Sequence, residues 1–117
     1  MGGASLSTAS HGDTLVITIS GDLDIVSSPE LDDRLTKAGG RHARVILDLT
    51  AVTFLDTSAL AVIVGHWKTA QAAGRTLALA GANYRYTKAL WVTGLADKMT
   101  MFDTLAEGLA ARPKAAG

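Results

Sequence analysis

The sequence predicts a single α/β domain built on a mostly parallel sheet. Along the chain, stretches with the alternating pattern of strands are interspersed with stretches that have the spacing of helices. An almost unbroken apolar run over residues 45–49 is typical of a strand covered on both faces, as parallel strands are. The length of 117 residues suits one domain with one core. We expect a mixed, mostly parallel sheet of four to five strands, joined by right-handed crossovers and flanked by about four helices.

The chain opens with a predicted β-hairpin. Residues 14–20 are rich in β-branched side chains, and apolar positions alternate with polar ones. A weaker alternating pattern over residues 6–10 precedes them, and a turn at residues 11–13 joins the two segments. We expect the first of these strands to lie at an edge of the sheet.

Residues 27–40 carry the signals of a complete helix with both of its ends marked. Ser28 is suited to cap its start, and Pro29 fits the first turn because the N–H that proline lacks has no partner there. Acidic residues gather near the start and Lys37 lies near the end, as the helix dipole favours. Gly39 permits a left-handed exit from the helix.

The strand at residues 45–49 leads through a short connection into the longest predicted helix, over residues 57–73. Its larger apolar residues recur at helical spacing and form one stripe, made of Leu60, Ile63, Val64 and Trp67. We expect the stripe, with Trp67, to pack in the core. Gly74 is expected to end the helix.

Four further elements are predicted toward the C-terminus. They are a strand over residues 76–80, a helix over 84–93, a short edge strand over 98–102 and a final helix over 104–111. Gly94 is expected to end the third helix, and Leu95 to make the accompanying apolar contact. Pro113 stops the last helix, so we expect the domain to span residues 5–111 and a flexible tail to span residues 112–117.

The composition argues against several classes of function. Eleven acidic and eleven basic residues give a formal net charge of zero, which argues against binding nucleic acid through an overall basic field. The absence of cysteine excludes disulfides, thiolate metal sites and a cysteine nucleophile. The densest apolar stretch, residues 59–64, is far shorter than the roughly 20 residues that span a bilayer, and no signal peptide is recognisable. We expect a cytoplasmic protein with neither a nucleic-acid nor a membrane partner.

No cofactor, metal ion or small-molecule substrate is predicted. The histidines at positions 11, 42 and 66 lack metal-ligand spacing, and the phosphate-binding motifs GxGxxG and GxxxxGK(S/T) are absent. No combination of nucleophile, base and acid stands out either. We therefore expect that the protein is not an enzyme.

One polar segment, Asp56-Thr57-Ser58, stands at the start of the longest helix. Each of its side chains can accept a hydrogen bond from an unpaired N–H at the helix start, so capping is one interpretation. In the other, a hydroxyl on an exposed helix N-terminus carries a covalent phosphate, because free N–H groups and the helix dipole favour an anion. The spacing is compatible with both interpretations.

A second polar segment, residues 20–24 with the sequence Ser-Gly-Asp-Leu-Asp, leaves the early strand. A solvated turn is its simplest interpretation. The C-terminal ends of parallel strands lie near one another, so Asp24 is also expected to neighbour Asp56 and Ser58 at that end of the sheet.

Together these segments resemble a known family. The run over residues 45–60, which ends in Asp-Thr-Ser-Ala-Leu, resembles the STAS domain, and more narrowly the bacterial anti-sigma factor antagonists. Residues 20–24 are similar to the Gly-Glu-Leu-Asp segment of that family, and Thr93-Gly94-Leu95 also fits. The resemblance covers residues 5–110, and the order and spacing of the short motifs are more specific than any one of them.

The resemblance implies a small α/β domain that acts as a regulatory switch. In the family, the second hydroxyl residue of an Asp-Ser-Ser-Gly-like motif is phosphorylated by a partner kinase, and that position is Ser58 here. Asp56 and Thr57 correspond to the two residues before it, and Asp24 to the Asp of the Gly-Glu-Leu-Asp-like loop. The chain departs from the family pattern in having Thr57 for serine and Ala59 for glycine.

The resemblance also implies protein partners. The unphosphorylated protein would bind an anti-sigma factor serine kinase and so free a sigma factor, while phosphorylation of Ser58 would switch binding off and a phosphatase would reset it. The residues implied in binding are Asp24, Asp56, Thr57 and Ser58. The alternative is an unphosphorylated STAS subunit of a larger assembly, such as a lipid transporter or a signalling scaffold. A third hypothesis, a ligand-binding or enzymatic domain that uses the strand-end carboxylates, lacks a cofactor motif.

Overall fold

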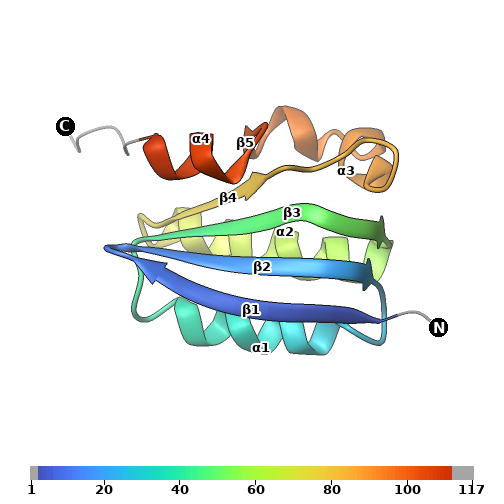
Figure 1. The fold of residues 1–117 in the computed structure, drawn as a ribbon. Coiled ribbons are helices and arrows are strands. Elements are labelled where there is room, and N and C mark those ends of the chain that lie inside the picture. The colour runs from blue at the N-terminus through green and yellow to red at the C-terminus, as the bar shows by residue number, and fades with distance from the viewer. Residues whose placement is uncertain (1–2, 112–117) are drawn as a thin grey trace.

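Five strands form one sheet in the computed structural model, which describes residues 3–111 (Figure 1). They are β1 (Ala4–His11), β2 (Thr14–Leu23), β3 (Arg44–Leu55), β4 (Thr76–Ala80) and β5 (Thr100–Phe102). Their order in the sheet follows the chain, β1-β2-β3-β4-β5. β1 and β2 are antiparallel and every later pair is parallel, which confirms the predicted mixed sheet and the predicted edge hairpin.

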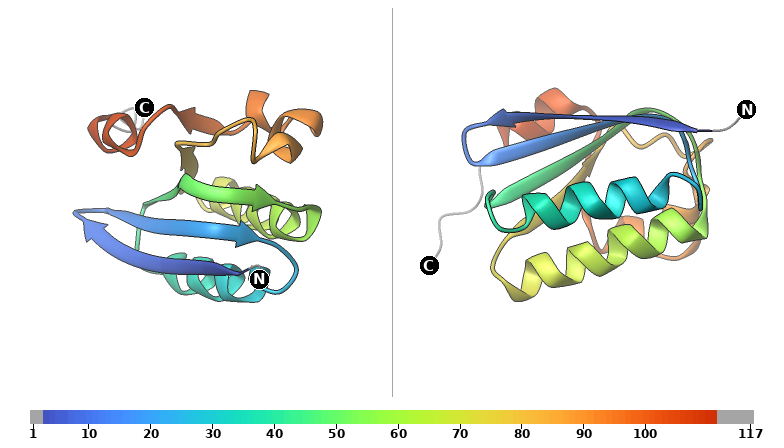
Figure 2. Two further views of the ribbon diagram at one scale, coloured as in Figure 1. Left: turned by 45° about the vertical axis from the view of Figure 1, so that its right-hand side comes forward. Right: turned by 90° about the horizontal axis from the view of Figure 1, so that it is seen from below.

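The helices cover the two faces of this sheet unequally. They are α1 (Ser28–Ala38), α2 (Thr57–Ala72), α3 (Lys88–Val92) and α4 (Leu105–Ala110), and a short 3₁₀ helix, η1 (Leu95–Asp97), follows α3. Figure 2 shows α1 and α2 side by side on one face, with α4 on the opposite face. The predicted alternation of strands and helices is confirmed.

Two apolar cores therefore lie on opposite sides of the sheet. The larger lies under α1 and α2 and contains Leu47 of β3, which is fully buried. The smaller lies under α4, where Ile46, Ala78 and Ala80 are buried. Successive strand residues point to opposite faces, so β3 supplies one side chain to each core in turn. This confirms the prediction that residues 45–49 form a strand covered on both faces.

Strands β2 and β3 continue well beyond the residues predicted for them. β2 ends at Leu23 rather than Ser20, and β3 ends at Leu55 rather than Leu49. The added part of β3 leaves most of its side chains exposed and buries only Val52 and Leu55, so it has no apolar run to mark it. It is a strand because its backbone continues the ladder with β2, through register shifts. The predicted connection and the predicted solvated turn are thus mostly strand.

The two ends of α1 differ from the prediction. Ser27 rather than Ser28 occupies the N-cap position, and its side chain makes no capping hydrogen bond. Gly39 is right-handed, with φ −60° and ψ −24°, so the predicted left-handed exit is wrong. The chain instead keeps turning through residues 41–42, whose N–H groups donate to the carbonyl of Ala38, and this path needs no left-handed residue.

Helix α2 is within one residue of its predicted length. Asp56 caps its start, and Gly74 follows its end in the left-handed conformation, with φ 73°. Leu60 and Ile63 of the predicted stripe are buried, and Trp67 is half-buried against the larger core, which confirms the stripe as a packing surface.

Helix α3 is shorter than predicted because a turn replaces its first part. Residues 84–87 form this turn. Asn83 accepts three hydrogen bonds from the backbone of this turn. Its side-chain oxygen accepts from the N–H of Arg85, and its carbonyl accepts from the N–H groups of Tyr86 and Thr87, so the backbone departs from the helical pattern.

The C-terminal elements otherwise follow the prediction. Gly94 is left-handed, with φ 80°, and Leu95 is buried beside it. β5 begins at Thr100, two residues later than predicted, because η1 and its end take up the preceding positions. Pro113 and the tail over residues 112–117 lie outside the described residues.

Candidate functional site

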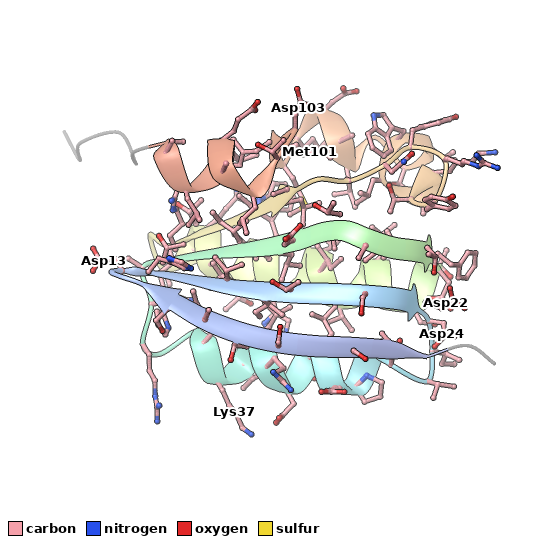
Figure 3. All side chains as sticks on the ribbon, in the orientation of Figure 1. Asp13, Asp22, Asp24, Lys37, Met101 and Asp103 are labelled. Atoms are coloured by element: carbon pink, nitrogen blue, oxygen red, sulfur yellow. The ribbon has the colours of Figure 1, made fainter. Side chains whose placement is uncertain are left out.

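The predicted site residues lie where β2 and β3 end. Asp24 directly follows β2, and Asp56 directly follows β3. The two strand ends are joined by a hydrogen bond, in which the N–H of Asp56 donates to the carbonyl of Leu23 over 3.1 Å. Figure 3 shows Asp22 and Asp24 at this end of the sheet, opposite Asp13 in the hairpin turn. The parallel pairing of β2 and β3 thus brings both polar segments to one edge, as expected.

Asp56 joins the two segments through both of its carboxylate oxygens. Oδ1 accepts a hydrogen bond from the N–H of Ala59 over 3.0 Å and so caps α2. Oδ2 accepts one from the N–H of Ile25 over 3.1 Å, in the loop between β2 and α1. One side chain therefore sets the position of that loop relative to the start of α2.

Asp24 organises its own loop instead of reaching across to the helix. Its Oδ1 accepts hydrogen bonds from the N–H groups of Val26, over 3.0 Å, and Ser27, over 3.2 Å. The Ser27 hydroxyl donates to the carbonyl of Asp22 and accepts from the N–H of Asp24, each over 2.9 Å. No hydrogen bond joins Asp24 to Ser58 within residues 3–111, so Asp56 is the link between them.

Thr57 and Ser58 occupy the first two helical positions of the 16-residue α2. Thr57 is exposed and Ser58 is half-buried. Neither hydroxyl, and neither backbone N–H, has a hydrogen-bond partner in the part of the chain that the structure describes. Because Asp56 supplies the cap, both hydroxyls remain available. The backbone N–H groups of Thr57 and Ser58 lie at the positive end of the helix dipole.

Three exposed apolar side chains are close in the sequence to these polar residues, and sequence reasoning missed them. Ile25 is 69% exposed, Val26 is 80% exposed and Phe54 is 49% exposed; we call these three residues the apolar rim. Exposed apolar side chains gathered beside one site are typical of a surface that contacts another protein. The signal in the sequence was the Ile-Val pair set between polar residues directly after Asp24.

The structure also pairs two residues that the sequence analysis did not connect. Nε2 of His66 in α2 lies 2.6 Å from Oδ1 of Asp32 in α1, a contact across 34 positions of the chain. The pair links α1 and α2 at a position eight residues after Ser58 along α2. Among residues 3–111, no group of three or more His, Asp or Glu side chains is placed to hold a metal ion.

None of the described helices is both long and apolar enough to cross a membrane.

Comparison with known proteins identifies the family of the chain. The STAS domain model matches residues 5–108 of the chain. An anti-sigma-B factor antagonist from Staphylococcus epidermidis is 29% identical over 97 residues, which cover 81% of this chain and 89% of that protein.

Solved structures share the fold. The crystal structure of an anti-sigma factor antagonist from Mycobacterium paratuberculosis matches with a TM-score of 0.83 at 19% identity and covers 92% of both chains. The Bacillus cell fate determinant SpoIIAA, in its phosphorylated form, matches with a TM-score of 0.73 at 20% identity, covering 90% of this chain and 96% of that one. The family match, together with this fold, shows that the chain belongs to the STAS domain family, among relatives that are bacterial anti-sigma factor antagonists.

Proposed function

We propose that the protein is an anti-sigma factor antagonist that is regulated by phosphorylation of Ser58. When Ser58 is unmodified, the protein binds an anti-sigma factor, and the sigma factor held by that partner is freed for transcription. The anti-sigma factor also acts as a serine kinase, transfers phosphate from ATP to Ser58 and thereby ends the complex. The observation that carries the proposal is the Ser58 hydroxyl at the start of α2, which has no hydrogen-bond partner among residues 3–111, in a chain whose relatives are anti-sigma factor antagonists.

The position of Ser58 favours a change in binding over a change in fold. A phosphoryl group adds about −1.5 to −2 charges. At the N-terminus of α2, the unpaired N–H groups of Thr57 and Ser58 and the helix dipole stabilise that charge in the free protein. In a complex, the apolar rim beside Ser58 would be covered by the partner, and a dianion buried there would cost several kcal/mol to desolvate. The cost falls on the interface.

Asp24 and Asp56 support this surface as structural residues. Their carboxylates hold the loop that presents Ile25 and Val26, and they hold it against α2. Neither carboxylate is hydrogen-bonded to the Ser58 hydroxyl in the described chain, so neither is placed to act as a base on it. We therefore assign the protein the role of kinase substrate. The kinase partner would supply ATP, Mg²⁺ and the catalytic base. A phosphatase would return Ser58 to the binding form, and we expect the whole cycle to take place in the cytoplasm.

The test measures the affinity of four forms of the protein for a purified anti-sigma factor kinase from the same organism. Without ATP, wild type and Ser58→Ala are expected to bind with similar affinity, Thr57→Ala no more than a few-fold more weakly, and Ser58→Asp at least about tenfold more weakly. With ATP and Mg²⁺, wild type and Thr57→Ala should gain one phosphate and dissociate, while Ser58→Ala stays bound.

Mass-spectrometric mapping of the phosphate decides the site. Phosphate on Thr57 with Ser58 unmodified would overturn the assignment. A stable complex that is insensitive both to ATP and to Ser58→Asp would favour a structural subunit of a larger assembly.

A further inference from the structure

An open apolar groove runs along α2 next to the proposed site. It encloses about 620 Å³ between α2 and the segment that carries η1. Leu60 and Val64 of α2 line one side, Leu95 lines the other, and Thr57 lies at the end where α2 begins. Thr57 directly precedes Ser58, so one end of the groove lies within one residue of the proposed phosphorylation site, although Ser58 itself does not line the groove.

The charge on this groove has one sign. Lys68 of α2 and Lys98, which follows η1, both line it, and both are exposed. Neither belongs to an ion pair within residues 3–111. None of the acidic side chains that the structure describes lines the groove. An apolar groove bordered by two free ammonium groups is complementary to an apolar segment that carries carboxylates.

A glycine in the wall of the groove gives an independent indication of close approach. Gly65 lies in the interior of α2, where glycine lowers helix stability relative to alanine. Nothing in the described part of the chain requires a glycine there: its φ is not positive, and a Cβ atom would meet no described atom within 4 Å. Because Gly65 has no side chain, nothing projects from the helix at this point of the groove wall, and a partner's backbone can pack directly on the helix there.

We propose that this groove, lined by Leu60, Val64, Gly65, Lys68, Leu95 and Lys98, receives an apolar, carboxylate-bearing segment of the anti-sigma factor. This inference rests on the proposed function and extends the binding surface from the apolar rim and Ser58 along α2. It also adds a cause for release after phosphorylation. A phosphoryl group on Ser58, which is next to Thr57 at the end of the groove, would repel the carboxylates of the seated segment.

Three variants and one control test the groove against the anti-sigma factor, without ATP. Lys68→Glu and Lys98→Glu reverse the charge, and Gly65→Ala adds a side chain to the groove wall. Arg41→Glu is the matched charge reversal, because Arg41 is exposed, has no ion pair in the described chain, and follows α1 at the opposite end of the molecule from Ser58. Each is expected to fold as wild type does, and Gly65→Ala should raise the melting temperature by a few degrees.

The expected result is weaker binding from each groove variant alone. Lys68→Glu and Lys98→Glu should each lower affinity about fivefold to tenfold, and Gly65→Ala about tenfold in spite of its greater stability. Arg41→Glu should bind as wild type does.

Tryptophan fluorescence adds a local readout. Trp67 and Trp91 are the two tryptophans of the chain, and Trp67 lines the groove. In a Trp91→Phe background, binding of the partner should therefore shift the Trp67 emission.

The outcomes separate the two proposals. If wild type and the Ser58→Asp form respond as proposed but all three groove variants bind as wild type does, the groove assignment is wrong and the proposed function stands. If wild type binds no anti-sigma factor, both are overturned.

Discussion

Asp56, Thr57 and Ser58 are three polar neighbours that the fold assigns to different tasks. Asp56 is extended, with φ −99° and ψ 178°, and this backbone places its carboxylate over the first turn of α2, where it caps the N–H of Ala59. Thr57 and Ser58 are already helical, and neither hydroxyl makes a hydrogen bond within residues 3–111. The sequence was compatible with any of the three as the cap, and the backbone conformation at the junction decides which one it is.

This division of tasks predicts opposite consequences for two alanine variants. Asp56→Ala removes the cap of α2 and the bond to Ile25 in the adjoining loop, so it should lower the free energy of unfolding by about 1–2 kcal/mol. Ser58→Ala removes no hydrogen bond in the described chain and should change it by less than about 0.5 kcal/mol. Urea denaturation followed by circular dichroism measures both. Equal losses would mean that Ser58 has a structural task.

At the scale of elements, the hydrogen-bond pattern of the opening hairpin follows from one contact. The N–H of Asp22 donates to the carbonyl of Gly3, which marks these two as a hydrogen-bonded pair. Pairs of this kind recur at every second residue of an antiparallel ladder. In the register of β1 with β2, Ser7 opposite Thr18 therefore points its N–H into the sheet, and Thr8 points its N–H out from the free edge.

Proline at these two neighbouring positions should act very differently. Ser7→Pro removes a donor to β2 and should lower the free energy of unfolding by about 3 kcal/mol or more. Thr8→Pro removes an N–H that faces solvent at the edge and should cost no more than about 1 kcal/mol. Both side chains are exposed, so neither change disturbs the core. Thermal unfolding compares them, with Ser7→Ala and Thr8→Ala as controls. A larger loss from Thr8→Pro would contradict the register.

At the scale of the whole molecule, the sheet separates two cores of different size. The larger one includes buried residues of β2, β3, β4, α1 and α2. The smaller one has three buried residues, Ile46, Ala78 and Ala80, closed by the partly exposed Phe102 and by α4. Most of the apolar surface buried on folding therefore lies on the α1–α2 side of the sheet. α4 closes the other side with six residues and a cap from Thr104.

Two adjacent residues of β3 test this asymmetry. Leu47 and Ile46 are both fully buried, one in each core. Leu47→Ala should lower the free energy of unfolding by about 3–5 kcal/mol, because the larger core is enclosed on all sides and a cavity would remain. Ile46→Ala should cost about 2–3 kcal/mol, because partly exposed neighbours can move into the space.

Denaturant unfolding gives both values for the two β3 variants. Equal or reversed losses would mean that α4 closes its core as firmly as the two long helices close theirs.

Much of the fold could be predicted from local pattern, and the errors have two causes. The hairpin, the buried run of β3, the length of α2 and the left-handed glycines at positions 74 and 94 all depend on residues close in sequence. The ends of β2 and β3 depend on pairing between the two strands, which no apolar pattern records. The turn that Asn83 forms in place of the first part of α3 is a local error: its hydrogen bonds join residues two to four positions apart, but the apolar pattern of a helix does not record them.

The sequence by itself determined the α/β class, the order of the elements and the polar segments that carry the candidate site, because periodicity, capping residues and short motifs are local properties. Only the tertiary structure decided how those segments meet. The long pairing of β2 with β3 brings Asp24 and Asp56 to one edge, where Asp56 caps α2 and the Ser58 hydroxyl has no partner among the described residues. The hydrogen bonds that join the two segments connect residues about 30 positions apart. They form because the C-terminal ends of neighbouring parallel strands lie at the same edge of the sheet.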